Sequence, residues 1–451
     1  MKRGTIFFFF AVLPLVPVFL SSCAVNPVSG RHELMLLSEK DEIRLGRKTD
    51  SQVVRQYGLY EDKRLTAYLN ELGQRLARVS HRPSLPYHFK IVDSPVVNAF
   101  AVPGGYVYIT RGILAYLNSE AELAGVMGHE IGHITARHTA EQYTRATLAQ
   151  LGLGLGMVFS DTFRAFGDLA QFGVGMMFLK FSRDNERQAD DLGVEYASRT
   201  GYDASQLARF FETLERMEEK GGRSGLPGWF STHPNPEDRI GAVRKRAREW
   251  QSKLGLRNMK VNRNAYLWRI DGLVFGEDPR QGYLSENVFY HPLLRFQFPV
   301  PPGWKLQNTR SQVRIISPGK DAVMLFWISR SRTPREAAEK FVCDSGASVI
   351  ESRGERVNGL AAHRVVSELK TRKGLVTILS YFIKKDRKVY EFHGLCIKSR
   401  FYYHYAPLFG DTMRGFKKLT DRKKIHVKPA RVRVRITRRS GTPRKLLVAL
   451  G

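Results

Sequence analysis

One short run in the sequence combines residue types and spacing that suit metal-dependent hydrolysis: His129-Glu130-Ile131-Gly132-His133. On a helix, side chains four positions apart lie on one face, so the two imidazoles can reach one ion. Glu130 lies beside them and can act as a general base toward water. Apolar residues flank the run, and a buried acid between two buried histidines needs a partner. The pattern predicts one zinc ion per chain rather than two surface histidines.

A zinc site of this kind needs a third protein ligand. The metzincin class would place Gly and His where this chain has Ala136 and Thr139, and His138 lies on another side of the helix. Glu186 and Asp190 are four residues apart, so they share a face of a later predicted helix. Glu186 can bind zinc, and Asp190 can hydrogen-bond the free nitrogen of a ligating histidine. The alternative is an ordinary acidic first turn, which helices favour.

Hydrophobic periodicity and turn residues predict the elements that position these groups. Ser119 and Glu122 form a capping box at the start of the HExxH helix. Pro103-Gly104-Gly105 separates two apolar runs and predicts a hairpin over residues 96–110. Other helices are predicted over residues 38–80, 182–200, 204–220 and 236–254, and a strand over residues 88–93. The Gly-rich residues 147–181 predict either a mobile flap or a packed helical hairpin.

The charge is distributed unevenly along the 451 residues. Residues 1–240 hold 27 Lys and Arg against 27 Asp and Glu, whereas residues 241–451 hold 45 against 16, which is the whole net charge of +29. With 43% hydrophobic residues, the chain is neither disordered nor collagen-like. Short β-branched runs separated by helical patterns predict a separate α+β domain over residues 290–451, after a linker over residues 256–289. A basic surface is either simply solvated or binds anions.

The N-terminal segment has the layout of an export signal. Two basic residues precede an apolar run over residues 6–20, which is too short for a comfortable membrane span. Leu20-Ser21-Ser22-Cys23 resembles the box of bacterial lipoproteins, in which the cysteine is lipidated. The resemblance implies a signal peptide over residues 1–22 and a lipid anchor on Cys23 at the outer membrane, facing the periplasm. The alternative is a plain secretory signal with a chance cysteine.

The wider pattern around the HExxH motif resembles one family, the HtpX/BepA-like zinc metallopeptidases, in their lipid-anchored periplasmic branch. HExxH followed by Glu186 and Asp190 is similar to the gluzincin peptidases in general. The motifs that carry the closer resemblance are Asn98-Ala99-Phe100-Ala101-Val102-Pro103-Gly104-Gly105, Thr110-Arg111-Gly112, residues 185–190, Gly201-Tyr202-Asp203 and Ser231-Thr232-His233-Pro234. The tetratricopeptide repeats of the BepA relative are not apparent, since no period near 34 residues follows residue 254.

This resemblance implies an α+β fold: a mainly helical gluzincin-type metallopeptidase domain with a small edge-strand sheet over residues 23–255, before the C-terminal domain. It implies zinc ligands His129, His133 and Glu186, with Glu130 as general base and acid. It implies a catalytic His233 that stabilises the oxyanion, although this residue is alternatively a loop-packing histidine. The substrate would pair as an extended strand with the edge formed by Asn98, Ala99, Phe100 and Ala101.

The resemblance favours a zinc endopeptidase that hydrolyses unfolded or misassembled envelope proteins as quality control. Two other classes remain open: a non-catalytic lipoprotein scaffold, and a hydrolase of another amide such as peptidoglycan. A neutral imidazole near an open zinc position is also a natural fourth ligand. We therefore hypothesise a resting state in which His233 closes the site and must move away for catalysis.

Two further expectations concern the C-terminal half. In an oxidising compartment, Cys343 and Cys396 are expected to form a disulfide. Arg431, Arg433 and Arg435 alternate with apolar residues, which predicts a strand with one arginine face. Because an exported chain does not meet nucleic acid, we expect anionic lipid or lipopolysaccharide as the partner of this domain. The rival interpretation is a solvated strand edge whose arginines deter aggregation.

Overall fold

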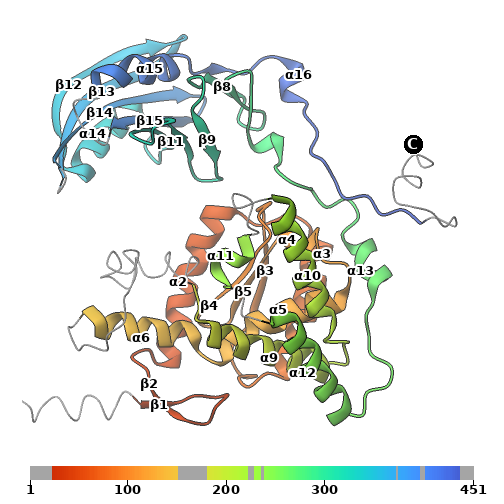
Figure 1. Cartoon of the computed structure of the whole chain (residues 1–451). Helices are drawn as coiled ribbons and strands as arrows, with labels where there is room; N and C mark the ends of the chain where they lie inside the picture. Colours follow the sequence, from red (N-terminus) through yellow and green to blue (C-terminus); the bar gives the residue numbers. More distant parts are fainter. Residues whose placement is uncertain are drawn as a thin grey trace, which may run out of the picture. The chain divides into compact units, whose positions relative to one another are not determined.

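The computed structural model describes residues 23–150, 180–221, 228–234, 238–371, 374–396 and 402–436. These form two compact units: the first runs to Gly276 and also takes in the chain end from Arg431, and the second consists chiefly of residues 277–430. The predicted signal peptide and most of the predicted flap at residues 147–181 lie outside the described residues. Each unit has its own apolar core (Figure 1).

Helix α5 (Glu120–Thr135), which carries the HExxH motif, lies at the centre of the first unit, and all of its residues are buried. Ser119 caps it, since its hydroxyl accepts from the Glu122 amide at 3.1 Å, but the predicted capping box is incomplete because the Glu122 carboxylate accepts from the Asn118 amide instead. Helices α3, α9 and α10 pack against it. The described helices of this unit are α2 (Glu39–Tyr57), α3 (Lys63–Arg78), α4 (Arg111–Leu114), α5, α6 (His138–Gln150), α9 (Arg183–Arg199), α10 (Gln206–Gly221), α11 (Gly228–Thr232), α12 (Arg239–Lys253) and α13 (Arg263–Arg269).

A three-stranded sheet lies beside α5 (Figure 1). Its order is β3 (His88–Val92), β5 (Tyr106–Thr110), β4 (Ala99–Val102), so that β4 is an edge strand. Strands β4 and β5 form the predicted hairpin, and β3 runs parallel to β5. Gly105 in the turn has a φ of +92°, and a Cβ there would lie 2.3 Å from the Pro86 carbonyl oxygen, so only glycine fits. A separate pair, β1 (Cys23–Val25) and β2 (His32–Leu34), precedes α2.

The second unit is rich in sheet, as expected of an α+β domain. A seven-stranded antiparallel sheet has the order β12 (Ser348–Val357), β13 (Leu360–Thr371), β14 (Gly374–Lys385), β15 (Lys388–Cys396), β11 (Ala322–Ile328), β10 (Val313–Ile316), β9 (Lys305–Asn308). A second sheet has the order β16 (Lys417–Lys418), β8 (Phe296–Pro299), β7 (Val288–His291), β6 (Tyr283–Ser285). Helices α14 (Pro334–Ser345) and α15 (Tyr402–Arg414) pack on the larger sheet, and α16 (Arg422–Ile425) follows.

The boundary between the units differs from the predicted one. Tyr266, Ile270 and Leu273 are buried in the core of the first unit, so most of the predicted linker belongs to that unit. Strands β6 and β7 begin the second unit before residue 290. The prediction failed because α13 is short, so its sequence pattern is weak. Its apolar residues can be recognised as core residues only from their contacts in the folded unit.

The chain end was also assigned to the wrong domain. The Gly272 amide donates to the Val432 carbonyl at 2.9 Å, and the Val432 amide donates to the Leu273 carbonyl at 2.8 Å. Arg431, Arg433 and Arg435 are exposed, as their alternation predicted, but they line the first unit and belong to no named strand. Arg431 donates to the Gly272 carbonyl, and Arg433 lies 3.9 Å from Asp271.

The predicted disulfide between Cys343 and Cys396 is wrong, because both cysteines are free. Cys343 is exposed on α14, which packs against one face of the large sheet with Val365, Phe382 and Val389. Cys396 is buried in the core on the opposite face, where α15 packs. Alternation along β15 sends neighbouring side chains to opposite faces, so the sheet itself separates the two thiols.

Candidate metal centre

Glycines allow α5 and α9 to approach each other closely enough to bring the candidate ligands together. A Cβ added to Gly128 would lie 2.9 Å from the Gly193 carbonyl oxygen. A Cβ added to Gly193 would lie 2.8 Å from the His129 backbone nitrogen. This close packing places Glu186, on the first turns of α9, opposite the two histidines of α5.

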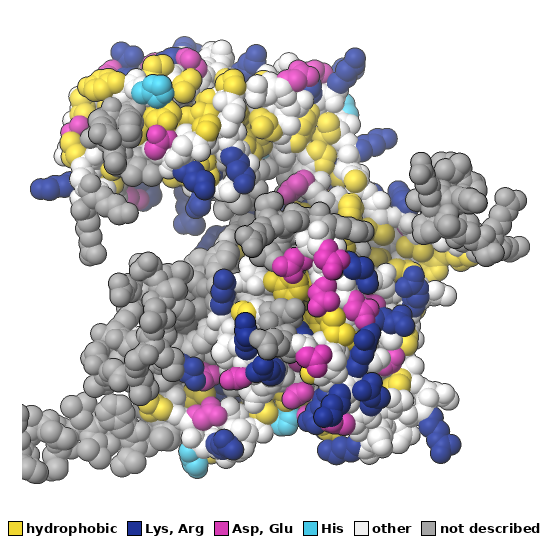
Figure 2. Space-filling view, viewed as in Figure 1, with side chains coloured by type: hydrophobic (Ala, Val, Ile, Leu, Met, Phe, Trp, Pro, Cys, Tyr) yellow, Lys and Arg dark blue, Asp and Glu magenta, His cyan; other side chains and the backbone are white. Residues whose placement is uncertain are grey.

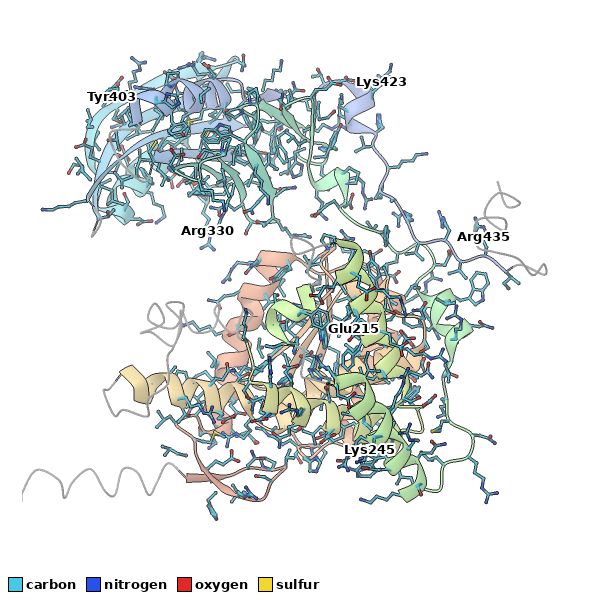
Figure 3. The ribbon with its side chains drawn as sticks, viewed as in Figure 1. Glu215, Lys245, Arg330, Tyr403, Lys423 and Arg435 are labelled. Atoms are coloured by element: carbon cyan, nitrogen blue, oxygen red, sulfur yellow. The ribbon has the colours of Figure 1, made fainter. Side chains whose placement is uncertain are left out.

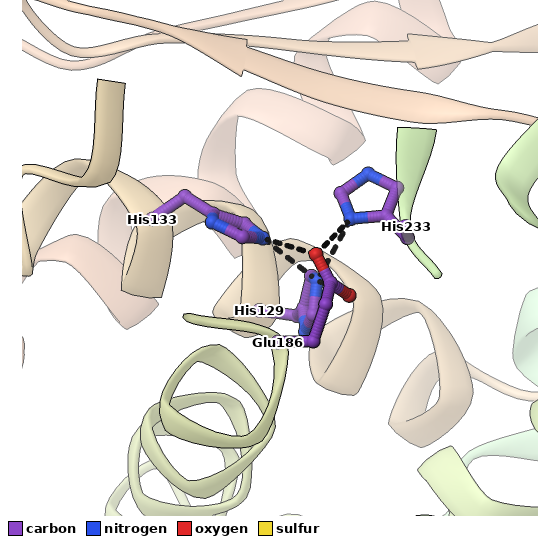
Figure 4. A group of neighbouring side chains, drawn as sticks. All are labelled: His129, His133, Glu186 and His233. Carbon is purple, nitrogen blue, oxygen red and sulfur yellow. Dashed lines mark hydrogen bonds and ion pairs between the residues drawn. The ribbon is translucent and has the colours of Figure 1, made fainter. Parts of the chain in front are cut away.

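Four buried side chains meet between these helices: His129 and His133 from α5, Glu186 from α9, and His233, which follows α11 (Figure 4). One ligand atom from each lies within 4.8 Å of the others. The Glu186 carboxylate is 3.4 Å from His133 Nε2 and 3.0 Å from His233 Nδ1. His129 Nε2 is 3.1 Å from His133 Nε2 and 3.3 Å from His233 Nδ1. Three imidazoles and one carboxylate on a common centre form a donor set that suits zinc.

Glu130 provides a further test of whether a metal fits here. Its side chain is buried, and neither carboxylate oxygen has a hydrogen-bond partner among the described residues. An unpaired carboxylate is costly to bury unless a cation or a bound water satisfies it. Oε1 lies 3.6 Å from His233 Nε2, so the carboxylate faces the same centre as the four candidate ligands. A metal at this centre would bind the four candidate ligands, and its water would give the Glu130 carboxylate a hydrogen-bond partner.

The pKa shifts follow from burial and from the mutual contacts of these groups. Burial raises the pKa of Glu130, and burial lowers the pKa of His133 well below its usual value. Burial alone would raise the pKa of Glu186, but His233, His133 and His129 lower it well below the usual value. The carboxylate of Glu186 is therefore charged and His133 neutral, which are the forms that bind a metal.

The edge strand lies beside this centre. A small cavity, with a volume of about 10 Å³, is lined by Ala101 from β4 and by His133 from α5. Ala99 and Phe100 are buried, and Phe100 stacks on Tyr108 of β5. Asn98 precedes β4, and its carbonyl accepts from the Thr110 amide at 3.1 Å. Of the four residues predicted to bind substrate, Ala101 therefore lies next to a candidate ligand, and Asn98, Ala99 and Phe100 precede it along the same edge of the sheet.

Comparison with known proteins agrees with this geometry. Residues 63–247 match the model of peptidase family M48. The beta-barrel assembly-enhancing protease of Escherichia coli (strain K12) is 31% identical over 245 residues, which cover 52% of this chain and 50% of that protein. The mitochondrial metalloendopeptidase OMA1 of Schizosaccharomyces pombe is 30% identical over 237 residues, or 50% of this chain and 65% of that protein.

Residues 63–247 are a peptidase family M48 domain. M48 metallopeptidases use zinc, and the comparisons support a metalloendopeptidase. The chain spans about half the length of the bacterial relatives that it matches. A cyanobacterial PsbP structure from Synechocystis covers 29% of this chain and 91% of its own, but its TM-score of 0.26 and identity of 14% support no argument about the second unit. No helix among the described residues is both long and apolar enough to span a membrane.

Asp190 contacts one of the candidate ligands. Its Oδ1 is 2.9 Å from His129 Nδ1, so it can fix the orientation of that imidazole. Arg239, which sequence reasoning missed, donates to both oxygens of Asp190 at 2.8 Å and to Glu186 at 3.3 Å. Its guanidinium also lies over the Phe211 ring, 3.9 Å from the centroid.

His138 was also missed as a site residue. Its Nδ1 lies 2.9 Å from Nδ1 of the candidate ligand His133. Its Nε2 lies 2.8 Å from Gln188 Oε1, so His138 links the orientation of His133 to α9. Burial lowers the pKa of His138 to about 4, which keeps it neutral. Neither Arg239 nor His138 has a motif spacing relative to its partner, so only the folded chain shows these contacts.

Proposed function

We propose that this protein is a zinc-dependent endopeptidase of the bacterial envelope that is anchored by a lipid on Cys23 and cleaves unfolded or misassembled envelope proteins. The observation that carries the proposal is the convergence of His129, His133 and Glu186 beside the buried carboxylate of Glu130, which has no hydrogen-bond partner among the described residues. The M48 match and the two relatives supply the reaction class. The anchor, the location at the outer membrane and the quality-control role are extensions from the sequence.

The residues of this chain have separable tasks in the proposed reaction. A bound zinc ion would polarise the scissile carbonyl and acidify water. Glu130 would accept a proton from the attacking water on a carboxylate oxygen and then donate it to the leaving amine. Burial raises the pKa of Glu130, which makes its carboxylate a stronger proton acceptor. Asp190 and His138 would hold the two histidine ligands in orientation.

The proposed role of His233 has two stages. In the conformation described here its Nδ1 lies 3.3 Å from His129 Nε2, among the candidate ligands. His233 also stacks on Trp229, with ring centroids 4.3 Å apart, so its position is supported by packing. We propose that this is the closed resting arrangement. Movement of His233 would free a position for substrate, after which its imidazole could stabilise the oxyanion.

The substrate would be recognised as an extended chain. Strand β4 pairs only with β5 among the described strands, so its outer edge can accept a further strand. Main-chain pairing gives affinity with little dependence on sequence. A folded protein rarely offers a free strand, whereas an unfolded chain does so readily. This reasoning selects unfolded or unassembled polypeptides as the substrate class, in keeping with the name of the Escherichia coli relative.

The first experiment is a digest of casein and of an unfolded outer-membrane protein, with and without a zinc chelator. We expect cleavage that the chelator abolishes and that added zinc restores. Glu130→Gln should remove cleavage while retaining zinc, and Glu71→Gln, at an exposed position of α3, is the matched control that should cleave normally. Binding of unfolded protein without cleavage would favour a scaffold. Release of peptidoglycan fragments without cleavage of protein would favour the other amide hydrolase.

A further inference from the structure

Three separate chain segments build one strongly basic end of the second unit. They are the turn between β7 and β8 (residues 292–295), the end of β14 with the turn and the first residue of β15 (residues 384–388), and β16 with α16 (residues 417–425). Lys385 Nζ donates to the Leu294 carbonyl at 2.9 Å, and the Leu419 amide donates to the Arg295 carbonyl at 3.0 Å. These contacts hold the segments together, and we call them the basic end.

The basic end contains ten Lys and Arg residues and only two Asp, a net charge of +8. Eight of the cations are exposed; Figure 2 colours Lys and Arg side chains dark blue, and Figure 3 labels Lys423 on α16. The exposed cations are Arg295, Lys384, Arg387, Lys388, Lys417, Lys418, Arg422 and Lys423.

The two acids neutralise little of this charge. Asp386 binds the buried Lys385 at 2.5 Å and also attracts the exposed Lys418, and Asp421 accepts from the Lys423 backbone amide at 2.8 Å. No ion pair within the described part of the chain joins one of the eight exposed cations to a carboxylate. So many unneutralised like charges repel one another unless an anion lies close to them.

An apolar side chain projects from the same end. Leu293 lies in the turn between β7 and β8 and is 65% exposed, whereas its neighbours Pro292 and Leu294 are more buried. The Leu293 amide donates to the Arg280 carbonyl at 3.2 Å, which fixes the turn. A fixed, exposed leucine within a cluster of cations suits an interface that is anionic at its surface and apolar just below.

We propose that the basic end docks on a bilayer surface that contains anionic phospholipids, with Leu293 entering the headgroup layer. Phospholipid headgroups supply many phosphates in a plane, and the acyl region below them accepts the leucine. The phosphates of nucleic acid would satisfy the cations but offer nothing to Leu293. This site replaces the arginine stripe at Arg431, Arg433 and Arg435 as the lipid-binding surface of the second unit, because that stripe lies on the first unit.

The test is co-sedimentation with vesicles, using the chain from residue 23 with Cys23→Ser so that no acyl anchor contributes. One set of vesicles is neutral phosphatidylcholine, and the other also contains phosphatidylglycerol. The test variant reverses three cations of the basic end, Lys388→Glu, Lys417→Glu and Lys418→Glu. The matched control reverses three exposed lysines in other parts of the same unit, Lys305→Glu, Lys320→Glu and Lys370→Glu, and therefore has the same net charge.

We expect binding to the anionic vesicles only, weakened by salt. Since each cation near an anionic surface strengthens partitioning about fivefold, the test variant should lose at least about a hundredfold in affinity. The control variant should lose far less, because its charges lie outside the basic end. Leu293→Ser should weaken binding roughly tenfold while leaving the salt dependence unchanged.

Equal losses in the test and control variants would overturn the proposal, because net charge rather than this surface would then decide binding. Equal binding to neutral vesicles, or no binding to either kind, would also overturn it. Full affinity of Leu293→Ser for the anionic vesicles would show that Leu293 does not enter the headgroup layer. Thermal melting of each variant checks that it is folded. Casein cleavage by the same variants is a separate readout, so failure of docking and failure of the proposed peptidase function are distinguishable.

Discussion

Replacement of Asp190 should affect zinc affinity and folding stability through two different contacts, with His129 and with Arg239. Asp190 is 4% exposed, and it contacts His129 Nδ1 at 2.9 Å and two nitrogens of Arg239 at 2.8 Å. In Asp190→Ala, His129 loses the acceptor that fixes its imidazole, and loss of such a partner typically weakens metal affinity about 10- to 100-fold. Arg239 remains buried and keeps only its 3.3 Å contact to Glu186 and its position over the Phe211 ring. Removal of one partner of a buried ion pair typically lowers the free energy of unfolding by about 3–5 kcal/mol.

The double variant Asp190→Ala/Arg239→Met tests whether these two losses have different causes. Removal of the guanidinium removes the unpaired charge, so the double variant should recover most of the stability that Asp190→Ala loses. Zinc affinity should stay low, since His129 still lacks its acceptor. Competition with a chromophoric chelator measures the affinity. Amide hydrogen exchange in α5 and α9 of the metal-free protein measures the stability. Wild-type zinc affinity in Asp190→Ala, or recovery of affinity in the double variant, would refute the reasoning.

Three further predictions concern the ligands, the helix contact and the second unit. Glu130→Gln should bind zinc normally but lose about 10²- to 10⁴-fold in peptide hydrolysis, whereas Glu186→Ala should lose the metal; normal turnover by Glu130→Gln would exclude the proposed base. Gly193→Ala should push α9 away from His129, lower the free energy of unfolding by about 1–3 kcal/mol and weaken zinc binding, as chemical denaturation and metal titration would show. Burial lowers the pKa of His291 from 6.5 to about 4, and its Nδ1 accepts from the Leu294 amide, so the second unit should be fully stable above pH 6.5 and lose stability as the pH falls toward 4. In His291→Asn this pH dependence should flatten; an unchanged melting profile would contradict the assignment.

Much of the local structure followed from the sequence because the signals are local. The Ser119 cap, the HExxH spacing and the Pro103-Gly104-Gly105 turn each involve residues a few positions apart. Their conformations depend on neighbouring backbone groups, so the helix start and the hairpin appear where the sequence predicted them. The distance between His129 and His133 is likewise set by one turn of a helix.

The predictions that failed depend on contacts between distant residues. The free thiols of Cys343 and Cys396 lie on opposite faces of a sheet, which no count of cysteines can show. The return of Val432 to the first unit depends on pairing with Leu273, more than 150 positions earlier in the chain. Arg239 reaches Asp190 only because α12 and α9 pack together.

The sequence by itself determined which residues of this protein can bind a metal, since a histidine or carboxylate ligand is a property of residue type and local spacing. The tertiary structure decided which of them meet: Glu186 reaches α5 because Gly128 and Gly193 let α5 and α9 approach, and His233 joins them from the segment after α11. It also gathered the ten cations of the basic end from three segments that are far apart in the chain. Residue type and local spacing decide which side chains can bind a metal. Which of them lie close together depends on how whole helices and strands pack.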